Sequence, residues 1–499
     1  MSSEATLSTQ YQKKTDRELI LDNPDTYIGS VENVDTHAWT FNNETKSIGL
    51  NPIHYVPGLY KLFDEGIVNC RDHCIRMQQA ISDKKNDIIP VSKIEVSIDD
   101  DGTIHMTNDG NGIDVAKHPE YDLWIPEMIF GHLRTSTNYD KTEKKIVGGK
   151  NGFGFKLVLI WSSYGYIETV DHIRGLKYCQ EFKNNLDIIE KPKITKSGKA
   201  KPYTKIVFRP DYARLGILGL SPDMISLLKK RVYDVAAVTD KALKVKYNST
   251  LIPVKNFQQY IDLYIGSKDA APRVYEEEGE RWEYAVALSP SHEFIQVSFV
   301  NGIHTAKGGK HVEYILGQIT RKLVAFIEKK KKIVVNAASI KEQLIIFLRC
   351  DIENPAFDSQ TKDFMNTPSS KFGSSCTVTD KFIEKLYDRF QDHKTWGDSE
   401  LFLDLASCNG CNCNQAVCVF TGIYSDKNGG ITIFPTIDGV GVTNWALPAN
   451  GGRISMSSTV VGKEGRYAID DDTDGAYDIA SVDIAETEGT SDYDYIDIT

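Results

Sequence analysis

The sequence predicts an α+β fold for most of the chain. Segments with the apolar spacing of amphipathic helices alternate with strand-like runs that are bounded by Gly, Pro, Asn and Asp. The 499 residues are too many for one hydrophobic core. Toward the C-terminus the composition shifts to Gly, Thr, Asp and Cys with little helical spacing. We therefore expect a β-rich or partly disordered acidic segment there.

Four segments are expected in chain order. They are an N-terminal arm at 1–30, a first domain at 31–250, a second domain at 251–395 and a divergent tail at 396–499.

Helix and hairpin patterns define the first domain. A helix is predicted to begin at Pro57, because proline suits a first turn and apolar residues recur after it at helical spacing. Alternating apolar residues on both sides of Asp101-Gly102 predict a hairpin, and "TKIVFRPDY" predicts another strand.

The second domain is predicted from three strands and one long helix. The strands are "EYAVALS", "IQVSFVNGI" and "LIIFLRCDI", and the helix is "GGKHVEYILGQITRKLVAFIEKKKKK".

Charge and composition restrict the class of protein. A net charge of −11 argues against a protein that coats nucleic acid with its whole surface, but it permits a local basic channel. No apolar run approaches the ~20 residues of a membrane helix. Nine cysteines without a secretory signal indicate a reducing compartment. We expect an intracellular protein of the cytoplasm or nucleus, with no membrane partner.

A polar stripe on the predicted helix is the first candidate site. Glu65, Asn69 and Asp72 follow one another at i, i+4 and i+7, so they share one face. An asparagine oxygen suits Mg²⁺, and a glutamate one turn away is placed to take a proton from an attacking water. The alternative is a solvated helix face.

A glycine-rich stretch, "VGGKNGFGFK" at 147–156, is the second candidate. Its four glycines allow backbone amides to converge on a phosphate chain. It lacks the Gly-Lys-Ser/Thr of a Walker loop and the spacing of a dinucleotide loop. The stretch therefore suggests another kind of nucleotide loop.

Three further polar stretches are weaker signals. In "NDGNGID", Asp109 is able to accept a hydrogen bond from an amino group such as that of adenine, although such stretches are usually turns. "RTSTNYD" offers small donors for ribose or phosphate, with a helix cap or loop as the alternative. "NPAFDSQTKDF" contains a lysine, Lys362, that would sense a terminal phosphate beside it, with a solvated loop as the alternative.

In this order and spacing, these stretches resemble one family. The sequence is similar to the N-terminal ATPase region of type IIA DNA topoisomerases, most closely in the eukaryotic form. The matching strings are "YQKKT", "NPDTYIGSVE", "VPGLYKLFDE", "YDLWIPEMIFGHLRTSTNYD", "VGGKNGFGFK", "SFVNGIHTAKGGKHVEYI" and "ENPAFDSQTKDF". The resemblance implies a GHKL (Bergerat) ATPase α/β sandwich followed by a ribosomal-S5-like transducer domain.

The resemblance also implies the cofactors and the site residues. ATP and Mg²⁺ are the expected cofactors, Glu65 the general base, Asn69 the magnesium ligand and Lys362 the residue that reaches the terminal phosphate. The implied nucleotide contacts are Tyr11 (to the partner subunit's nucleotide), Asn69, Asn108, Asp109, Ser136, Thr137, Asn138, Gly149, Lys150, Asn151, Gly152, Phe153, Gly154, Phe155, Lys156, Gln360, Thr361 and Lys362.

Partners follow from the same resemblance. It implies a homodimer through the ATPase domain that acts on double-stranded DNA. Lys330, Lys331 and Lys332 fall where the family contacts DNA, and consecutive lysines are able to neutralise phosphates without reading sequence. A solvated helix end is the alternative for these lysines. A separate DNA-cleavage subunit is expected, because no tyrosine-bearing cleavage segment is visible; the alternative is that this chain is a truncated gene product. The alternative function is a non-cleaving ATP-dependent clamp on DNA or protein.

Two departures from the family pattern are visible. Phe155 stands where the family usually has a small residue, and Cys70-Arg71 replaces a small pair after Asn69. Neither removes a catalytic group.

The tail carries two ambiguous signals. Asp470, Asp472 and Asp474 alternate before a glycine, which suits Mg²⁺ in a degenerate TOPRIM domain, but Trp396 stands where that domain's first acid belongs. An acidic, partly disordered tail is the alternative. Four thiols between Cys408 and Cys418 suggest a metal site, although their crowding is atypical of zinc.

Overall fold

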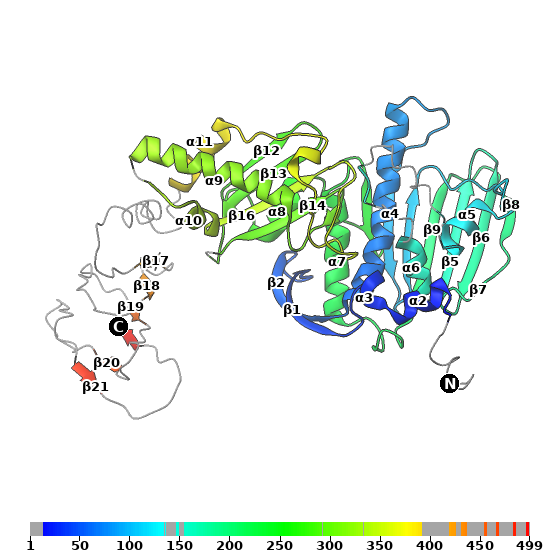
Figure 1. Ribbon diagram of the computed structural model, residues 1–499, viewed down its shortest axis with the longest axis horizontal. Helices are drawn as coiled ribbons and strands as arrows, with labels where there is room; N and C mark the ends of the chain where they lie inside the picture. The colour runs from blue at the N-terminus through cyan, green and yellow to red at the C-terminus, as the bar shows by residue number, and fades with distance from the viewer. Residues whose placement is uncertain are drawn as a thin grey trace, which may run out of the picture.

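The protein is described by a computed structural model (Figure 1). It describes residues 13–133, 135, 146–148, 154–291, 293–332 and 334–391, together with short strands after residue 418. These later strands are β17 (Val419–Ser425), β18 (Ile431–Thr436), β19 (Ile454–Met456), β20 (Arg466–Ala468), β21 (Asp483–Ala485) and β22 (Ile496–Ile498). The fold is α+β, as predicted.

A large mixed sheet forms the centre of the first part. Its strand order is β11-β10-β3-β4-β9-β5-β6-β7, with β8 paired to β6. The predicted hairpin is present, and its register pairs Ile94 with Asn108. The strands are β3 (Lys93–Ile98), β4 (Ile104–Asp109), β5 (Ser162–Asp171), β6 (Leu176–Lys183), β7 (Ile188–Ile189), β8 (Lys193–Lys196), β9 (Tyr203–Pro210), β10 (Lys244–Tyr247) and β11 (Thr250–Leu251).

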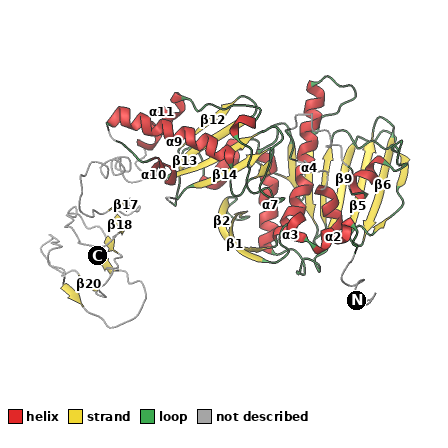
Figure 2. Cartoon of the chain, in the orientation of Figure 1, coloured by secondary structure: helices red, strands yellow, loops and turns green. Residues whose placement is uncertain are grey.

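Helices cover one face of this sheet (Figure 2). They are α4 (Pro57–Ser82), α5 (Ile125–Gly131), α6 (Gly154–Ile160) and α7 (Pro222–Ala237). Helix α4 begins at Pro57 as predicted, and its apolar stripe is buried because it faces the sheet. Burial of this stripe fixes which side chains of α4 face the interior.

The N-terminal segment packs against the first part. Thr15 and Glu18 form a capping box for α2 (Asp16–Asp22), which is followed by α3 (Pro24–Tyr27). A hairpin follows, made of β1 (Val34–Phe41) and β2 (Ile48–Tyr55). Ile20 and Ile28 lie in the hydrophobic core, so the described end of the predicted arm already belongs to the packed structure.

A smaller sheet forms the second part, in the order β12-β13-β16-β14-β15. The predicted strands and the long helix are present. The strands are β12 (Arg273–Glu278), β13 (Trp282–Leu288), β14 (Ile295–Val300), β15 (Ile303–His304) and β16 (Leu344–Cys350). The helices are α8 (Phe257–Ile265), α9 (Lys310–Lys331), α10 (Ala337–Glu342), the 3-10 turn η1 (Ser369–Lys371) and α11 (Asp380–Gln391). No described helix combines the length and apolar character that a membrane span requires.

Candidate nucleotide site between the two sheets

Glu65 lies where the two parts of the molecule meet. It belongs to α4 and is 5% exposed. Lys362, 297 residues later in the chain, donates a hydrogen bond from Nζ to Glu65 Oε1 at 3.1 Å. Lys61 Nζ lies 2.6 Å from the same oxygen, as an ion pair without hydrogen-bond alignment. One buried carboxylate is therefore held between two ammonium groups.

The protonation state of Glu65 follows from these contacts. Burial by itself raises the pKa of the carboxyl, because it penalises the charged form. The charges of Lys362 and Lys61 outweigh burial and lower the pKa of Glu65 to about 2. Glu65 is therefore ionised at neutral pH and is a weak base while both cations remain on it.

Asn69 and Asp72 share the buried face of α4 with Glu65. Asn69 Nδ2 donates to the Glu65 carbonyl oxygen at 2.6 Å, and among the described residues Asn69 Oδ1 receives no hydrogen bond. Asp72 is fully buried, and its Oδ1 accepts a hydrogen bond from the Gly148 amide at 2.9 Å. A solvated helix face is therefore excluded for this stripe.

The end of the glycine stretch packs directly on Glu65. A Cβ atom at Gly154 would overlap Glu65 Oε2, so glycine is required where α6 begins. Phe155 is 7% exposed and packs edge-on against Phe130, with ring centroids 5.3 Å apart. Its side chain thus belongs to the core. Lys156 Nζ donates to the Thr135 carbonyl at 2.6 Å, and burial lowers the pKa of Lys156 to about 8.

Asn108 and Asp109 lie at the end of β4 with different surroundings. Asn108 is 5% exposed, and its Nδ2 donates to the Asp109 carbonyl oxygen. Both carboxylate oxygens of Asp109 accept hydrogen bonds from Ser92, and one also accepts from the Lys93 amide at 2.8 Å. These bonds join the end of β4 to the start of β3. Both oxygens of the Asp109 carboxylate therefore already accept hydrogen bonds from within the chain.

The loop that carries Lys362 has a constrained backbone. Lys362 adopts a left-handed conformation with φ 63° and is 9% exposed. Thr361 Oγ1 donates to Asp363 at 3.0 Å, and Gln360 is half-buried beside it. Thr361 also packs close to Gly29, where a Cβ atom would lie 3.2 Å from the Thr361 methyl group.

The three lysines predicted to contact DNA lie at the end of α9 and are exposed. Lys330 Nζ lies 3.4 Å from Asp388 Oδ1 and 4.3 Å from the centre of the Tyr387 ring. Part of its charge is therefore already compensated. Lys331 ends the helix, and Lys332 is its left-handed cap with φ 61°.

Several predicted residues lie outside the described residues. These are Tyr11, Ser136, Thr137, Asn138, Gly149, Lys150, Asn151, Gly152, Phe153, Asp470, Asp472, Asp474 and the thiols from Cys408 to Cys418.

One residue of the site was missed from the sequence. Lys61 lies one turn before Glu65 on the same stripe. Its i, i+4 spacing to an acid was an available signal, although such pairs are usually exposed.

Comparison with known proteins identifies the family. The family model for DNA gyrase B matches residues 256–395, which include Lys362. The solved ATPase region of Saccharomyces cerevisiae topoisomerase II is 40% identical, with a TM-score of 0.70, and the match covers 77% of this chain and 98% of that one. This chain belongs to the type II DNA topoisomerase family.

Other proteins to which this chain is similar are also type II DNA topoisomerases. The solved ATPase and transducer domains of Balamuthia mandrillaris topoisomerase II are 39% identical with a TM-score of 0.72, covering 81% of this chain and 98% of that one. DNA topoisomerase 2 of Arabidopsis thaliana is 41% identical over 422 residues, or 83% of this chain and 28% of the relative. The DNA topoisomerase 2 of Acanthamoeba polyphaga mimivirus is 44% identical over 387 residues, which cover 76% of this chain and 30% of that enzyme. The chain thus spans less than a third of the length of the Arabidopsis and mimivirus enzymes.

Proposed function

We propose that this chain binds ATP with Mg²⁺ and hydrolyses it as the clamp-closing part of a type II DNA topoisomerase. The observation that carries the proposal is the contact between Glu65 on α4 and Lys362, which lies in a loop of the second part of the molecule. A buried carboxylate on one part of the molecule therefore contacts a cation from the other part, and a lysine in this place is able to contact the terminal phosphate of a bound nucleotide.

The residues present fit a magnesium ion. The amide of Asn69 is oriented by its hydrogen bond to the Glu65 carbonyl, and its oxygen is the kind of hard ligand that Mg²⁺ prefers. No group of three or more acidic, Cys or His side chains suited to a metal occurs among the described residues. A single protein ligand suits Mg²⁺, since substrate phosphates and water complete its shell. When bound, Mg²⁺ would neutralise charge on the phosphates.

Glu65 acts as general base in this proposal. Its carboxylate takes a proton from the water that attacks the terminal phosphate, and Lys362 supplies positive charge to that phosphate. While Lys362 stays on Glu65, the carboxylate is a weak base. Transfer of Lys362 to the terminal phosphate leaves Lys61 as the one described cation on Glu65 and restores basicity. Turnover then depends on a triphosphate being present.

The partners of this activity are part of the proposal. ATP would close a homodimer around a DNA duplex inside the cell, in the cytoplasm or nucleus, and hydrolysis would reset it. In this proposal a separate polypeptide carries out strand cleavage.

ATP turnover of Glu65→Gln and of the wild-type chain, with and without duplex DNA, tests the proposal. Loss of the base should lower kcat by on the order of 10²–10⁴-fold, while ATP binding measured by calorimetry is retained. Wild-type turnover that DNA stimulates supports the topoisomerase role. Equal turnover by the two proteins contradicts the role of Glu65, and wild-type ATP binding without turnover indicates a non-hydrolysing clamp.

A further inference from the structure

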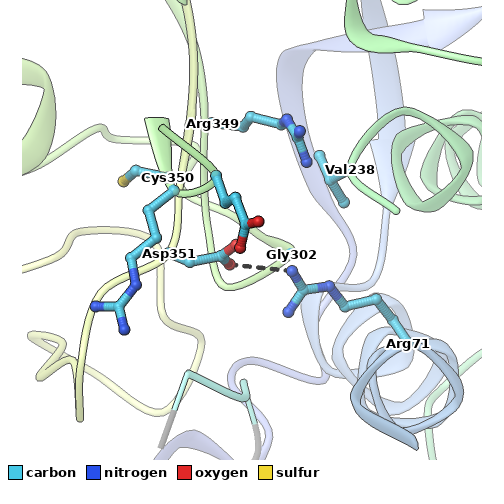
Figure 3. A pocket seen from close by; sticks show the side chains of 8 residues that line it. Arg71, Val238, Gly302, Arg349, Cys350 and Asp351 are labelled. Atoms are coloured by element: carbon cyan, nitrogen blue, oxygen red, sulfur yellow. Dashed lines mark hydrogen bonds and ion pairs between the residues drawn. The ribbon is translucent and has the colours of Figure 1, made fainter. Parts of the chain in front are cut away.

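Arg71 lies in a small recess between the two parts of the molecule (Figure 3). It belongs to α4, two residues after Asn69, and is 2% exposed. Its Nη2 donates to Asp351 Oδ1 at 3.1 Å, and Asp351 directly follows β16 of the second sheet. This ion pair therefore joins the helix of Glu65 to the part of the chain that carries Lys362.

The Arg71 guanidinium depends on this contact. Its Nε and Nη1 have no hydrogen-bond partner among the described residues, and Nη1 lies 3.9 Å from Asp72 Oδ1. A buried charge that loses its partner is strongly destabilised. Asp351 is thus the hydrogen-bonded partner of the buried Arg71 charge among the described residues, and Asp72 adds a longer ion pair.

Gly302 in the β14–β15 turn makes room for Arg71. Its φ is +75°, and a Cβ atom there would lie 2.7 Å from both Cδ and Nε of Arg71. On its other side the turn is held by Arg231, whose Nη2 donates to the Gly302 carbonyl at 2.8 Å and whose Nε donates to Asp64 at 2.7 Å. Arg71 and Arg231 of the first part therefore both contact the β14–β15 turn of the second part at Gly302.

The same turn reaches the start of the glycine stretch. Asn301 Nδ2 donates to the Val147 carbonyl at 3.3 Å and to the Ile352 carbonyl at 2.9 Å. The junction around Arg71 thus contacts both the nucleotide-site helix and the root of the predicted phosphate loop.

We propose that Arg71 is a positioning residue that, through Asp351 and the turn at Gly302, fixes the second sheet against α4 so that Lys362 meets Glu65. Arg71 contacts neither Glu65 nor Lys362, so it acts through the placement of the two parts. The inference rests on the proposed function, because its effect on turnover needs ATP hydrolysis.

A double-mutant cycle tests the proposal in the full chain. Arg71→Ala, Asp351→Asn and the double variant are compared for kcat and KM with ATP. Each single change should lower kcat on the order of tenfold with little change in KM, since it weakens a coupling contact. The double variant should be no worse than either single one. Arg71→Lys, which keeps the charge, should recover part of the loss.

An exposed ion pair provides the matched control. Arg209 Nη1 lies 3.6 Å from Asp101, and both side chains are about half exposed. Arg209→Ala and Asp101→Asn should leave kcat unchanged. Additive losses in the Arg71 cycle, or a lower melting temperature with unchanged kcat, would overturn the proposal.

Hydrogen–deuterium exchange without nucleotide separates this inference from the proposed function. Arg71→Ala should speed exchange at 299–305 and 344–352 relative to the wild type and Arg209→Ala. Unchanged exchange there overturns the positioning role even if the wild type hydrolyses ATP. Faster exchange in a chain that does not hydrolyse ATP supports the junction and refutes the proposed activity instead.

Discussion

At the scale of single residues, the contact of Glu65 with two lysines determines the chemistry of the site. Burial and the two cations act on the pKa of Glu65 in opposite directions, and the cations dominate. In the unfolded chain the carboxyl keeps its ordinary pKa near 4.5. As the pH falls, the unfolded state therefore takes up a proton before the folded state does.

Because the unfolded state is protonated at Glu65 before the folded state, the effect of removing Lys362 on the free energy of unfolding should depend on pH. The stabilisation from the Glu65 ion pairs is complete above about pH 4.5 and is lost as the pH falls toward about 2. Lys362→Met should cost on the order of 2 kcal/mol at pH 7. The difference in thermal stability from the wild type should shrink below pH 4.5, as followed by melting curves from pH 7 to 3.

Lys322→Met is the control for this measurement. Lys322 pairs with Asp380 at 2.6 Å, but Asp380 is 89% exposed. Because exposed pairs contribute little, this variant should change stability only slightly. A loss in Lys362→Met that is the same at every pH would contradict the ion-pair account.

At the scale of elements, the sequence predicted the face of the helix from Pro57 that carries Glu65 but not what packs on it. The stripe of Glu65, Asn69 and Asp72 follows from helical spacing, because an apolar face fixes how the rest of a helix is oriented. The contact of Glu65 with Lys362 bridges 297 residues and has no signature in local spacing. The engagement of Asp109 by Ser92 likewise depends on how the end of β4 meets its neighbour in the sheet.

The start of α6 gives an element-scale prediction. Gly154→Ala would place a methyl group against Glu65 Oε2 and displace either the carboxylate or α6. We expect kcat to fall on the order of tenfold or more, because small misplacement of catalytic groups is costly.

A second glycine in a helix provides the control. A Cβ atom at Gly317 in α9 would meet nothing within 4 Å. Gly317→Ala should therefore leave kcat unchanged and slightly raise the melting temperature. Unchanged turnover in Gly154→Ala would show that Glu65 and α6 are not packed as described.

At the scale of the whole molecule, the basic end of α9 lies away from α4, the helix that carries Glu65 (Figure 1). Its three lysines differ in their contacts, because Lys330 is engaged by Asp388 and Tyr387. The sequence shows only consecutive lysines, so it did not predict that Lys330 has partners within the chain.

DNA affinity as a function of salt concentration should reveal this difference. Each lysine that contacts a phosphate contributes nearly one unit to the slope of log affinity against log salt. Lys331→Ala and Lys332→Ala should each reduce the slope by about one, whereas Lys330→Ala should reduce it less. Equal slopes in all variants and the wild type would place the DNA contact elsewhere.

The packing of Thr361 on Gly29 has a consequence for shortened forms of the protein. A chain beginning at residue 31 would keep Glu65, Asn69 and Lys362 but would lack Ile20, Ile28 and the glycine on which Thr361 rests. Without Gly29, the loop that carries Lys362 would lose a packing contact, and the Lys362 ammonium would be held less well against the Glu65 carboxylate. Such a shortened protein should keep the proposed base Glu65 and the proposed magnesium ligand Asn69 and still turn over ATP poorly.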